Sequence, residues 1–176
     1  MNFRTLIFRR FVSSVSAVSG IEFAIILPLL LTLLLGFYDA GTAVAIYTKT
    51  RFATATLAQL TNQYTTIHDS DMSLISGATS AVLAPYSSTP VVSSVSQIAI
   101  NATGAATVSW SNTLTAGTNF SSLPAALAIP NSYLIYAKVS YTFTPSFSYF
   151  VSGPITLSDS LYVSPRNSPS ITRISP

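Results

Sequence analysis

The chain has 176 residues, a length that suits one membrane segment and one small domain. Only 7% of the residues are charged, against roughly a quarter in ordinary soluble domains, whereas 49% are hydrophobic. The formal net charge of +3 is not arranged as a basic stripe, so nucleic acid is not an expected partner. Cysteine is absent, which excludes a disulfide framework and a thiolate site.

Residues 1–17 form a basic leader that contains Arg4, Arg9 and Arg10. Positive residues before an apolar span favour the cytoplasmic side, so the N-terminus is expected inside and residues after about 48 outside. Lys49 and Arg51 follow the span and weaken this contrast in charge.

An uncharged run, residues 23–38, follows the leader. It would span roughly 24 Å as a helix, against a hydrocarbon core of about 30 Å, and flanking residues can extend it. Because the run is apolar all round, it predicts a membrane helix rather than a buried amphipathic helix. Residues 43–64 lack proline and glycine, and we expect one transmembrane and stalk helix over residues 18–67. A secreted chain cleaved near Ala45 is an alternative.

The residues at the start of the span carry the most specific pattern. Glu22 and Phe23 open a segment, Gly20-Ile21-Glu22-Phe23-Ala24-Ile25-Ile26-Leu27-Pro28-Leu29-Leu30, that resembles the TadE/TadF/TadG-like family of tight-adherence (Flp) pilus assembly proteins. The segment Gly36-Phe37-Tyr38-Asp39-Ala40-Gly41 is similar to the end-of-span pattern of the same family. The resemblance covers residues 9–51 well. It implies a pilin-like protein of the bacterial inner membrane.

The resemblance also implies a processing site. In prepilins a membrane peptidase cuts five residues before the glutamate, which places the bond here between Ala17 and Val18. Ala17 stands where prepilins usually have glycine, and TadG-like members need not be processed. Glu22 would pair with a neighbouring amine during assembly, or simply lie in the headgroup region.

The rest of the chain, residues 68–176, predicts a small extracytoplasmic domain. A helix is expected over 72–84, capped by Asp71 or Ser70 and stopped by Pro85. Alternating and β-branched residues predict strands over 91–100, 106–110, 133–143 and 155–163. We therefore expect an α+β fold, with a four-stranded antiparallel sheet packed on the lower stalk helix, a plan that resembles pilin-like proteins.

Enzyme chemistry has little support in the sequence. The only histidine, His68, lies beside Asp69 and Asp71, a group that would bind a cation weakly or, as we expect, serve as a solvated helix cap. No Gly-x-Ser-x-Gly elbow and no phosphate loop is present. We predict no catalytic, cofactor-binding or metal-binding residue and no cofactor.

Two functions of different classes remain. The first is a membrane-anchored minor pilin or pseudopilin-like component of tight-adherence pilus assembly. Its partners would be the lipid bilayer, other pilus-assembly membrane proteins contacted through the transmembrane helix, and prepilin peptidase. The second is an uncleaved single-pass adhesin or periplasmic adaptor. In either case the C-terminal domain would be periplasmic or, for a pilin, incorporated in a surface pilus.

Overall fold

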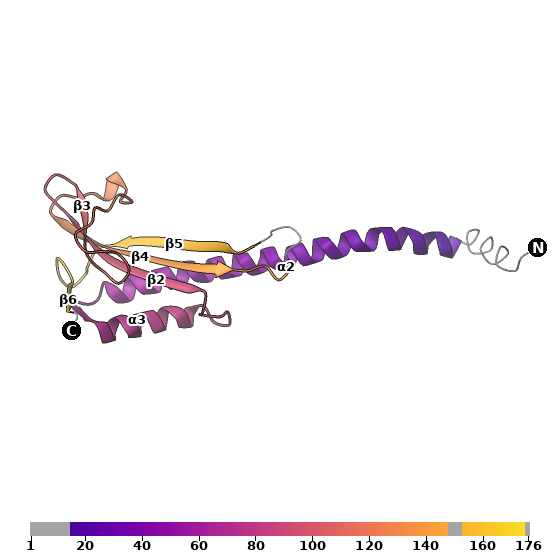
Figure 1. The fold of residues 1–176 in the computed structure, drawn as a ribbon, viewed down its shortest axis with the longest axis horizontal. Coiled ribbons are helices and arrows are strands. Elements are labelled where there is room, and N and C mark those ends of the chain that lie inside the picture. Colours follow the sequence, from indigo (N-terminus) through magenta and orange to yellow (C-terminus); the bar gives the residue numbers. More distant parts are fainter. Residues whose placement is uncertain (1–14, 148–152, 175–176) are drawn as a thin grey trace, which may run out of the picture. The chain divides into compact units, whose positions relative to one another are not determined.

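The structure is a computed structural model, and it describes residues 15–147 and 153–174. Its elements, most of which are labelled in Figure 1, are α2 (Val15–Thr61), β1 (Thr66–His68), α3 (Asp69–Val82), β2 (Val91–Ile100), β3 (Ala106–Ser111), the 3-10 helix η1 (Ala125–Leu127), β4 (Ser132–Phe143), β5 (Ile155–Val163) and β6 (Thr172–Ile174). The predicted α+β class, a long N-terminal helix followed by a small antiparallel sheet, is confirmed.

The chain divides into two compact units, and α2 contributes to both. Among the described residues, the first unit contains α2 up to Thr42, together with residues 145–147 and Gly153. The second unit contains the remainder of α2 from Ala43, all the strands, and α3. Pro28 lies inside α2, within the apolar part of the helix.

Helix α2 ends at Thr61, six residues before the predicted end at Ile67. The chain then makes a tight turn, in which the amide of Tyr64 donates to the carbonyl of Thr61 at 3.2 Å. Residues Thr66–His68 next form β1, which pairs in parallel with β6 near the C-terminus. The short run of β-branched residues before His68 favours this extended conformation over another helical turn.

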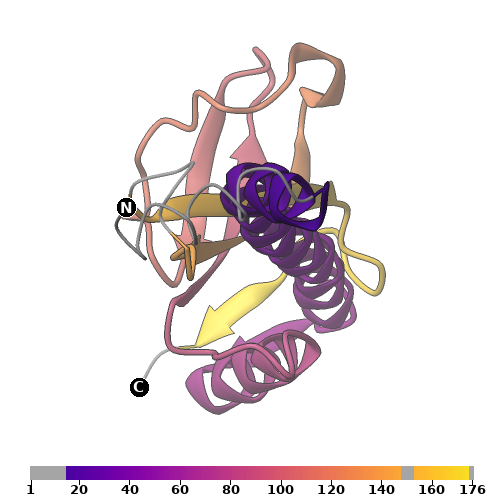
Figure 2. The same cartoon turned by 90° about the vertical axis from the view of Figure 1, so that its right-hand side faces the viewer.

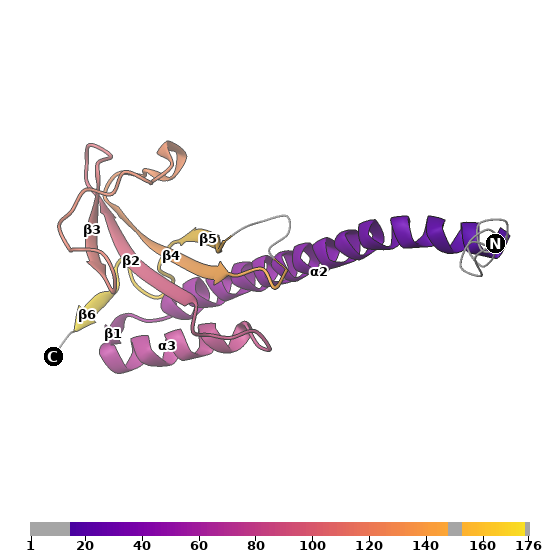
Figure 3. The ribbon, with the colours of Figure 1, turned by 45° about the vertical axis from the view of Figure 1, so that its right-hand side comes forward.

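The four-stranded sheet has the order β3-β2-β4-β5, and all of its neighbouring strands are antiparallel (Figure 3). Each predicted strand agrees with an observed one to within a residue at either end. The predicted turn at 101–104 joins β2 to β3, with Gly104 at a φ of 82°. The side chain of Asn101 accepts hydrogen bonds from the amides of Thr103 and Ala105, which stabilises the turn.

Helix α3 begins at Asp69, so the predicted start at Met72 with a cap at Asp71 or Ser70 is wrong. His68 is the N-cap, and the carboxylate of Asp71 accepts a hydrogen bond from the His68 amide at 2.9 Å. Asp71 therefore occupies the third helical position, from which it reaches back to the cap. The helix ends at Val82, shortly before Pro85.

The core of the second unit lies between the sheet, α3 and the C-terminal part of α2. Figures 2 and 3 show α3 beside this part of α2. Ile46 and Leu57 from α2, Ile75 from α3, and Ile135 and Val139 from β4 are buried in one cluster. The predicted packing of the sheet on the stalk helix is confirmed, and burial of these side chains is its main source of stability.

Candidate functional site

The first part of α2 is a long apolar surface. Its large side chains between Val18 and Tyr38 are mostly exposed, and none of the most apolar 18-residue stretch is buried within the structure. By length and composition, α2 is the one helix among residues 15–147 and 153–174 that is suited to crossing a membrane. An apolar surface of this size is unfavourable in water, because about 25 cal/mol is lost for each Å² left exposed.

The residues predicted for processing lie at the N-terminal end of this helix. The bond between Ala17 and Val18 falls within the first turn of α2, and Glu22 follows one turn later. The side chains of Glu22 and Phe23 are both exposed, with Phe23 beside the apolar surface. The predicted leader arginines, at positions 4, 9 and 10, lie outside the described residues.

At the other end of the span, Asp39 makes two hydrogen bonds with a segment far along the chain. One carboxylate oxygen accepts from the amide of Ser146 at 3.0 Å, and the other accepts from the amide of Phe147 at 2.9 Å. The ring of Phe147 also meets the ring of Tyr38 edge to face, with centroids 6.0 Å apart. All four residues belong to the first unit.

This arrangement explains how an acidic residue is accommodated at the end of an apolar helix. A buried carboxylate is unfavourable unless its oxygens accept hydrogen bonds, and here both of them do. Asp39 belongs to the segment 36–41 that resembles the end-of-span pattern of the family, but the sequence does not indicate its partners. Ser146 lies 107 residues away in a segment with no regular period, so no local signal could have located it.

A comparison with known protein families identifies the same helix. Residues 18–59 match the family model of TadE-like protein. The matched segment includes Glu22, Phe23 and Asp39 and ends within α2, which confirms the resemblance noted from the sequence. Neither the curated proteins nor the solved structures gave a match. Together, the TadE-like segment and the exposed apolar helix indicate membrane association.

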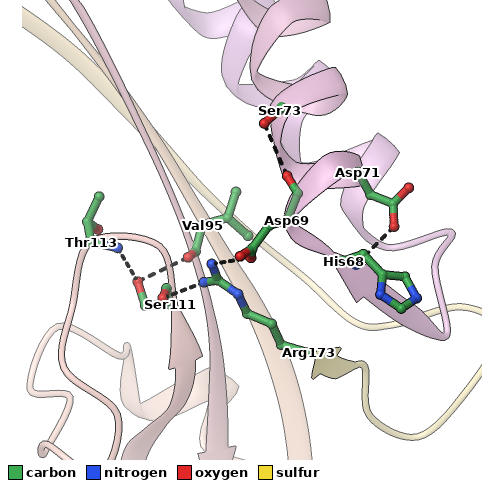
Figure 4. Close-up of polar contacts among 8 residues, drawn as sticks. All are labelled: His68, Asp69, Asp71, Ser73, Val95, Ser111, Thr113 and Arg173. Carbon is green, nitrogen blue, oxygen red and sulfur yellow. Dashed lines mark hydrogen bonds and ion pairs between the residues drawn. The ribbon is translucent and has the colours of Figure 1, made fainter. Parts of the chain in front are cut away.

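The acidic residues around His68 have separate partners within the fold. Figure 4 shows Asp69 and Asp71 pointing to different partners. Asp69 pairs with the guanidinium of Arg173 at 3.1 Å, whereas Asp71 caps the start of α3 through the His68 amide. Within residues 15–147 and 153–174, no three His, Cys, Asp or Glu side chains come together to hold a metal ion. Asp71 takes part in capping α3 from the third helical position, although the N-cap itself is His68 and not Asp71 or Ser70.

Arg173 has a second contact that fixes the C-terminal strand. Its guanidinium also donates to the carbonyl of Ser111 at 2.6 Å, and Figure 4 shows it between β3 and the start of α3. The arginine therefore connects β6 both to the end of β3 and to α3. No local signal in the sequence indicates this role, because the partners of Arg173 are distant in the chain.

The outer face of the sheet carries a hollow of about 440 Å³. Lys138 and Ser140 line it from β4, where they alternate with buried residues that face the core. Phe120 and Tyr136 also line it, with their ring centroids 5.0 Å apart. Across the part of the chain that the structure describes, the Lys138 ammonium has no hydrogen-bonding or ionic partner.

A third ring, Tyr162 of β5, continues this aromatic cluster. Its centroid lies 4.9 Å from that of Tyr136, and its hydroxyl donates to the carbonyl of Ser122 at 2.9 Å. Burial, followed by the neighbouring Tyr136, raises the pKa of the Tyr162 hydroxyl above its usual value. The phenol is therefore kept neutral, and the cluster joins β5 to the loop that follows β3.

Proposed function

We propose that the protein is a membrane-anchored minor pilin or pseudopilin-like component of tight-adherence pilus assembly. The TadE-like match supports involvement in this process. The observation that carries the proposal is the continuity of α2. This single helix begins with an exposed apolar surface and ends inside the core of the sheet domain. A continuous helix of this kind supports the proposal, because it links an apolar anchor covalently to the domain that follows it.

The role proposed is structural rather than enzymatic, with no cofactor. The apolar part of α2 would contact the lipid bilayer and the corresponding helices of other pilus-assembly membrane proteins. Exposed Glu22 at its N-terminal end would set the register of that contact by pairing with a cationic group of a neighbour. A carboxylate at the edge of a bilayer gains most from such a pair, because water no longer screens the two charges fully.

We further propose an inner-membrane topology with residues 1–17 in the cytoplasm and residues 68–176 outside. The three leader arginines support this orientation through the positive-inside rule. Half-buried Lys49 counts less as an opposing charge, since its ammonium group donates hydrogen bonds to carbonyl oxygens of the second unit. In this topology prepilin peptidase would reach the Ala17–Val18 bond from the cytoplasmic side.

Mass spectrometry of the intact membrane-extracted protein, with N-terminal sequencing, tests this proposal. The full chain is expressed with and without its native prepilin peptidase. A mature chain that begins at Val18 only when the peptidase is present supports the pseudopilin function. Ala17→Lys should block this cut, whereas Ala17→Gly should be cut at least as well. A chain that keeps its N-terminal residues in every case contradicts pilin-like processing.

A second candidate is an uncleaved, membrane-anchored adhesin or periplasmic adaptor. The hollow on the outer face of the sheet favours it, since Lys138, hydroxyl groups and aromatic rings line a concave surface. The two candidates differ in the fate of the leader and in the effect of Lys138→Ala. This substitution would weaken ligand binding by an adaptor and leave assembly of a pseudopilin unchanged.

A further inference from the structure

We propose that the Tyr38–Phe147 pair, fixed by Asp39, contacts the lipid headgroup region at this end of the span. The membrane would then be contacted by two parts of the chain, the helix and the segment that follows β4. This inference depends on the membrane anchoring proposed above but adds a contact that neither the span nor the family match implies. Its partner is the lipid interface itself.

The exposure of the aromatic rings is the first observation. Phe37 and Tyr38 are 74% and 59% exposed, and Phe147 is 39% exposed. Large aromatic side chains are usually buried in soluble domains, whereas at membrane–water interfaces they form belts at the level of the headgroups. The Tyr38–Phe147 contact places rings from two distant parts of the chain in one such group.

The second observation is the depth expected for this group. Tyr38 follows Phe23 by 15 residues, which corresponds to roughly 22 Å along a helix. The apolar run begins at Phe23 and ends at Tyr38, so the rings lie where the hydrocarbon gives way to headgroups. Residues 145–147 carry no charged side chain, and their entry into this region requires no ion to be desolvated.

The third observation is the satisfaction of the polar groups. Backbone amides that leave water for a bilayer are unfavourable unless they have partners. Asp39 accepts from the amides of both Ser146 and Phe147, and in return its own charge is shielded by two donors. Two backbone amides of the segment therefore already have hydrogen-bond acceptors when the segment enters a low-dielectric environment. The same two hydrogen bonds attach the segment to the helix.

Site-directed spin labelling tests this proposal, and the absence of cysteine makes each label unique. Phe147→Cys is labelled in the full chain, which is reconstituted in vesicles of phosphatidylethanolamine and phosphatidylglycerol. Collisions with oxygen, which concentrates in lipid, are compared with collisions with a water-soluble nickel chelate. Leu30→Cys reports the span. Leu127→Cys is the matched control, because Leu127 is 37% exposed and belongs to the second unit.

The oxygen-to-nickel ratio at position 147 is expected to exceed that at position 127 by about threefold or more and to fall below that at position 30. Adding Asp39→Ala should bring the ratio at 147 toward the value at 127 while the ratio at 30 stays high. Equal ratios at 147 and 127, with position 30 in lipid, would overturn the proposal and leave the anchor intact. A label at 147 shielded from both reagents would instead indicate a protein partner and overturn it too. A water-exposed label at 30 would contradict the anchoring itself.

Discussion

The Lys49 ammonium group donates a 2.5 Å hydrogen bond to the carbonyl oxygen of Ala84, 35 residues along the chain. It also donates to the carbonyl of Val82 at 3.3 Å. The last carbonyls of a helix have no intrahelical partner, and a cation at that end satisfies them and interacts well with the helix dipole. Lys49 therefore attaches the end of α3 to the stalk part of α2.

Replacing Lys49 with methionine should destabilise the second unit. Met retains the length of the apolar stem but leaves the carbonyls of Val82 and Ala84 without their charged donor. The free energy of unfolding is expected to fall by about 1 to 2 kcal/mol. Chemical denaturation of the full chain in detergent, followed by the fluorescence of buried Trp110, measures this change.

The matched control is Arg51→Met, which removes the same charge two residues later. Arg51 is exposed and has no hydrogen-bonding or ionic partner within residues 15–147 and 153–174. Its replacement should alter the free energy of unfolding by less than about 0.5 kcal/mol. Equal losses in the two variants would mean that net charge, and not the contact with α3, explains the effect.

The packing of the core can be tested by making the same substitution, leucine to alanine, at buried Leu57 and at exposed Leu74. Leu57 of α2 is 0% exposed within the core cluster, whereas Leu74 of α3 is 70% exposed. Leu57→Ala should lower the free energy of unfolding by about 2 to 5 kcal/mol, since it removes buried apolar atoms and leaves a cavity. Leu74→Ala should stay within about 0.5 kcal/mol of the parent chain, as exposed sites do. A similar loss at both positions would contradict the packing of the sheet on the stalk.

Local patterns in the sequence were sufficient for the strands but not for the contacts between distant segments. The alternation of apolar and polar residues in 133–143 predicted β4, because one face of the strand is buried and the other is exposed to solvent. This signal lies entirely within the strand. Strands β1 and β6 were missed because each has only three residues. Three residues are too few to show the two-residue alternation of a strand. Their pairing also joins Thr66 to Thr172, which is far away in the sequence.

The candidate site likewise combines features that the sequence predicts with contacts that it does not. The apolar span and Glu22 were recognised from composition and order along the chain, since bilayer thickness sets the length of such a run. The partners of Asp39 depend on where the segment after β4 lies in space, as do the partners of Arg173. The residues that form these hydrogen bonds belong to no recognisable sequence motif. Only the folded structure shows that they lie close together.

The C-terminal segment should loosen when Gln97 is replaced. Buried Gln97 accepts a hydrogen bond from the amide of Ile171 at 2.6 Å, and Trp110 donates to the carbonyl of the same residue at 2.7 Å. Gln97→Met leaves the Ile171 amide unsatisfied, which should cost about 1 to 3 kcal/mol. Hydrogen exchange should increase near Ile171. Gln59→Met, at an exposed position, is the control, and hydrogen exchange near Ile171 should be unchanged in this variant.

Alkaline pH should destabilise the sheet domain through Tyr141, which is buried, and Tyr162, which is half-buried. Burial, followed by the neighbouring Tyr136, raises the pKa of Tyr162 above 10.0, and burial with Tyr86 raises that of Tyr141. A folded-state pKa above the unfolded value means that the unfolded chain releases its proton first as pH rises. The stability that these neutral phenols contribute is complete below pH 10.0 and is lost as the pH passes through the raised folded-state values.

Unfolding free energies measured between about pH 8 and pH 11 test this dependence, because that range brackets the ordinary tyrosine pKa. The parent chain should lose stability steadily above pH 10.0. Tyr162→Phe keeps the ring contacts with Phe120 and Tyr136 but cannot ionise, so its curve should fall less steeply over the same range. It also loses the hydrogen bond to Ser122, which lowers its stability equally at every pH below 10.0. The test therefore depends on the slope of the unfolding free energy against pH and not on its absolute value. An unchanged slope in Tyr162→Phe would contradict the role assigned to this phenol.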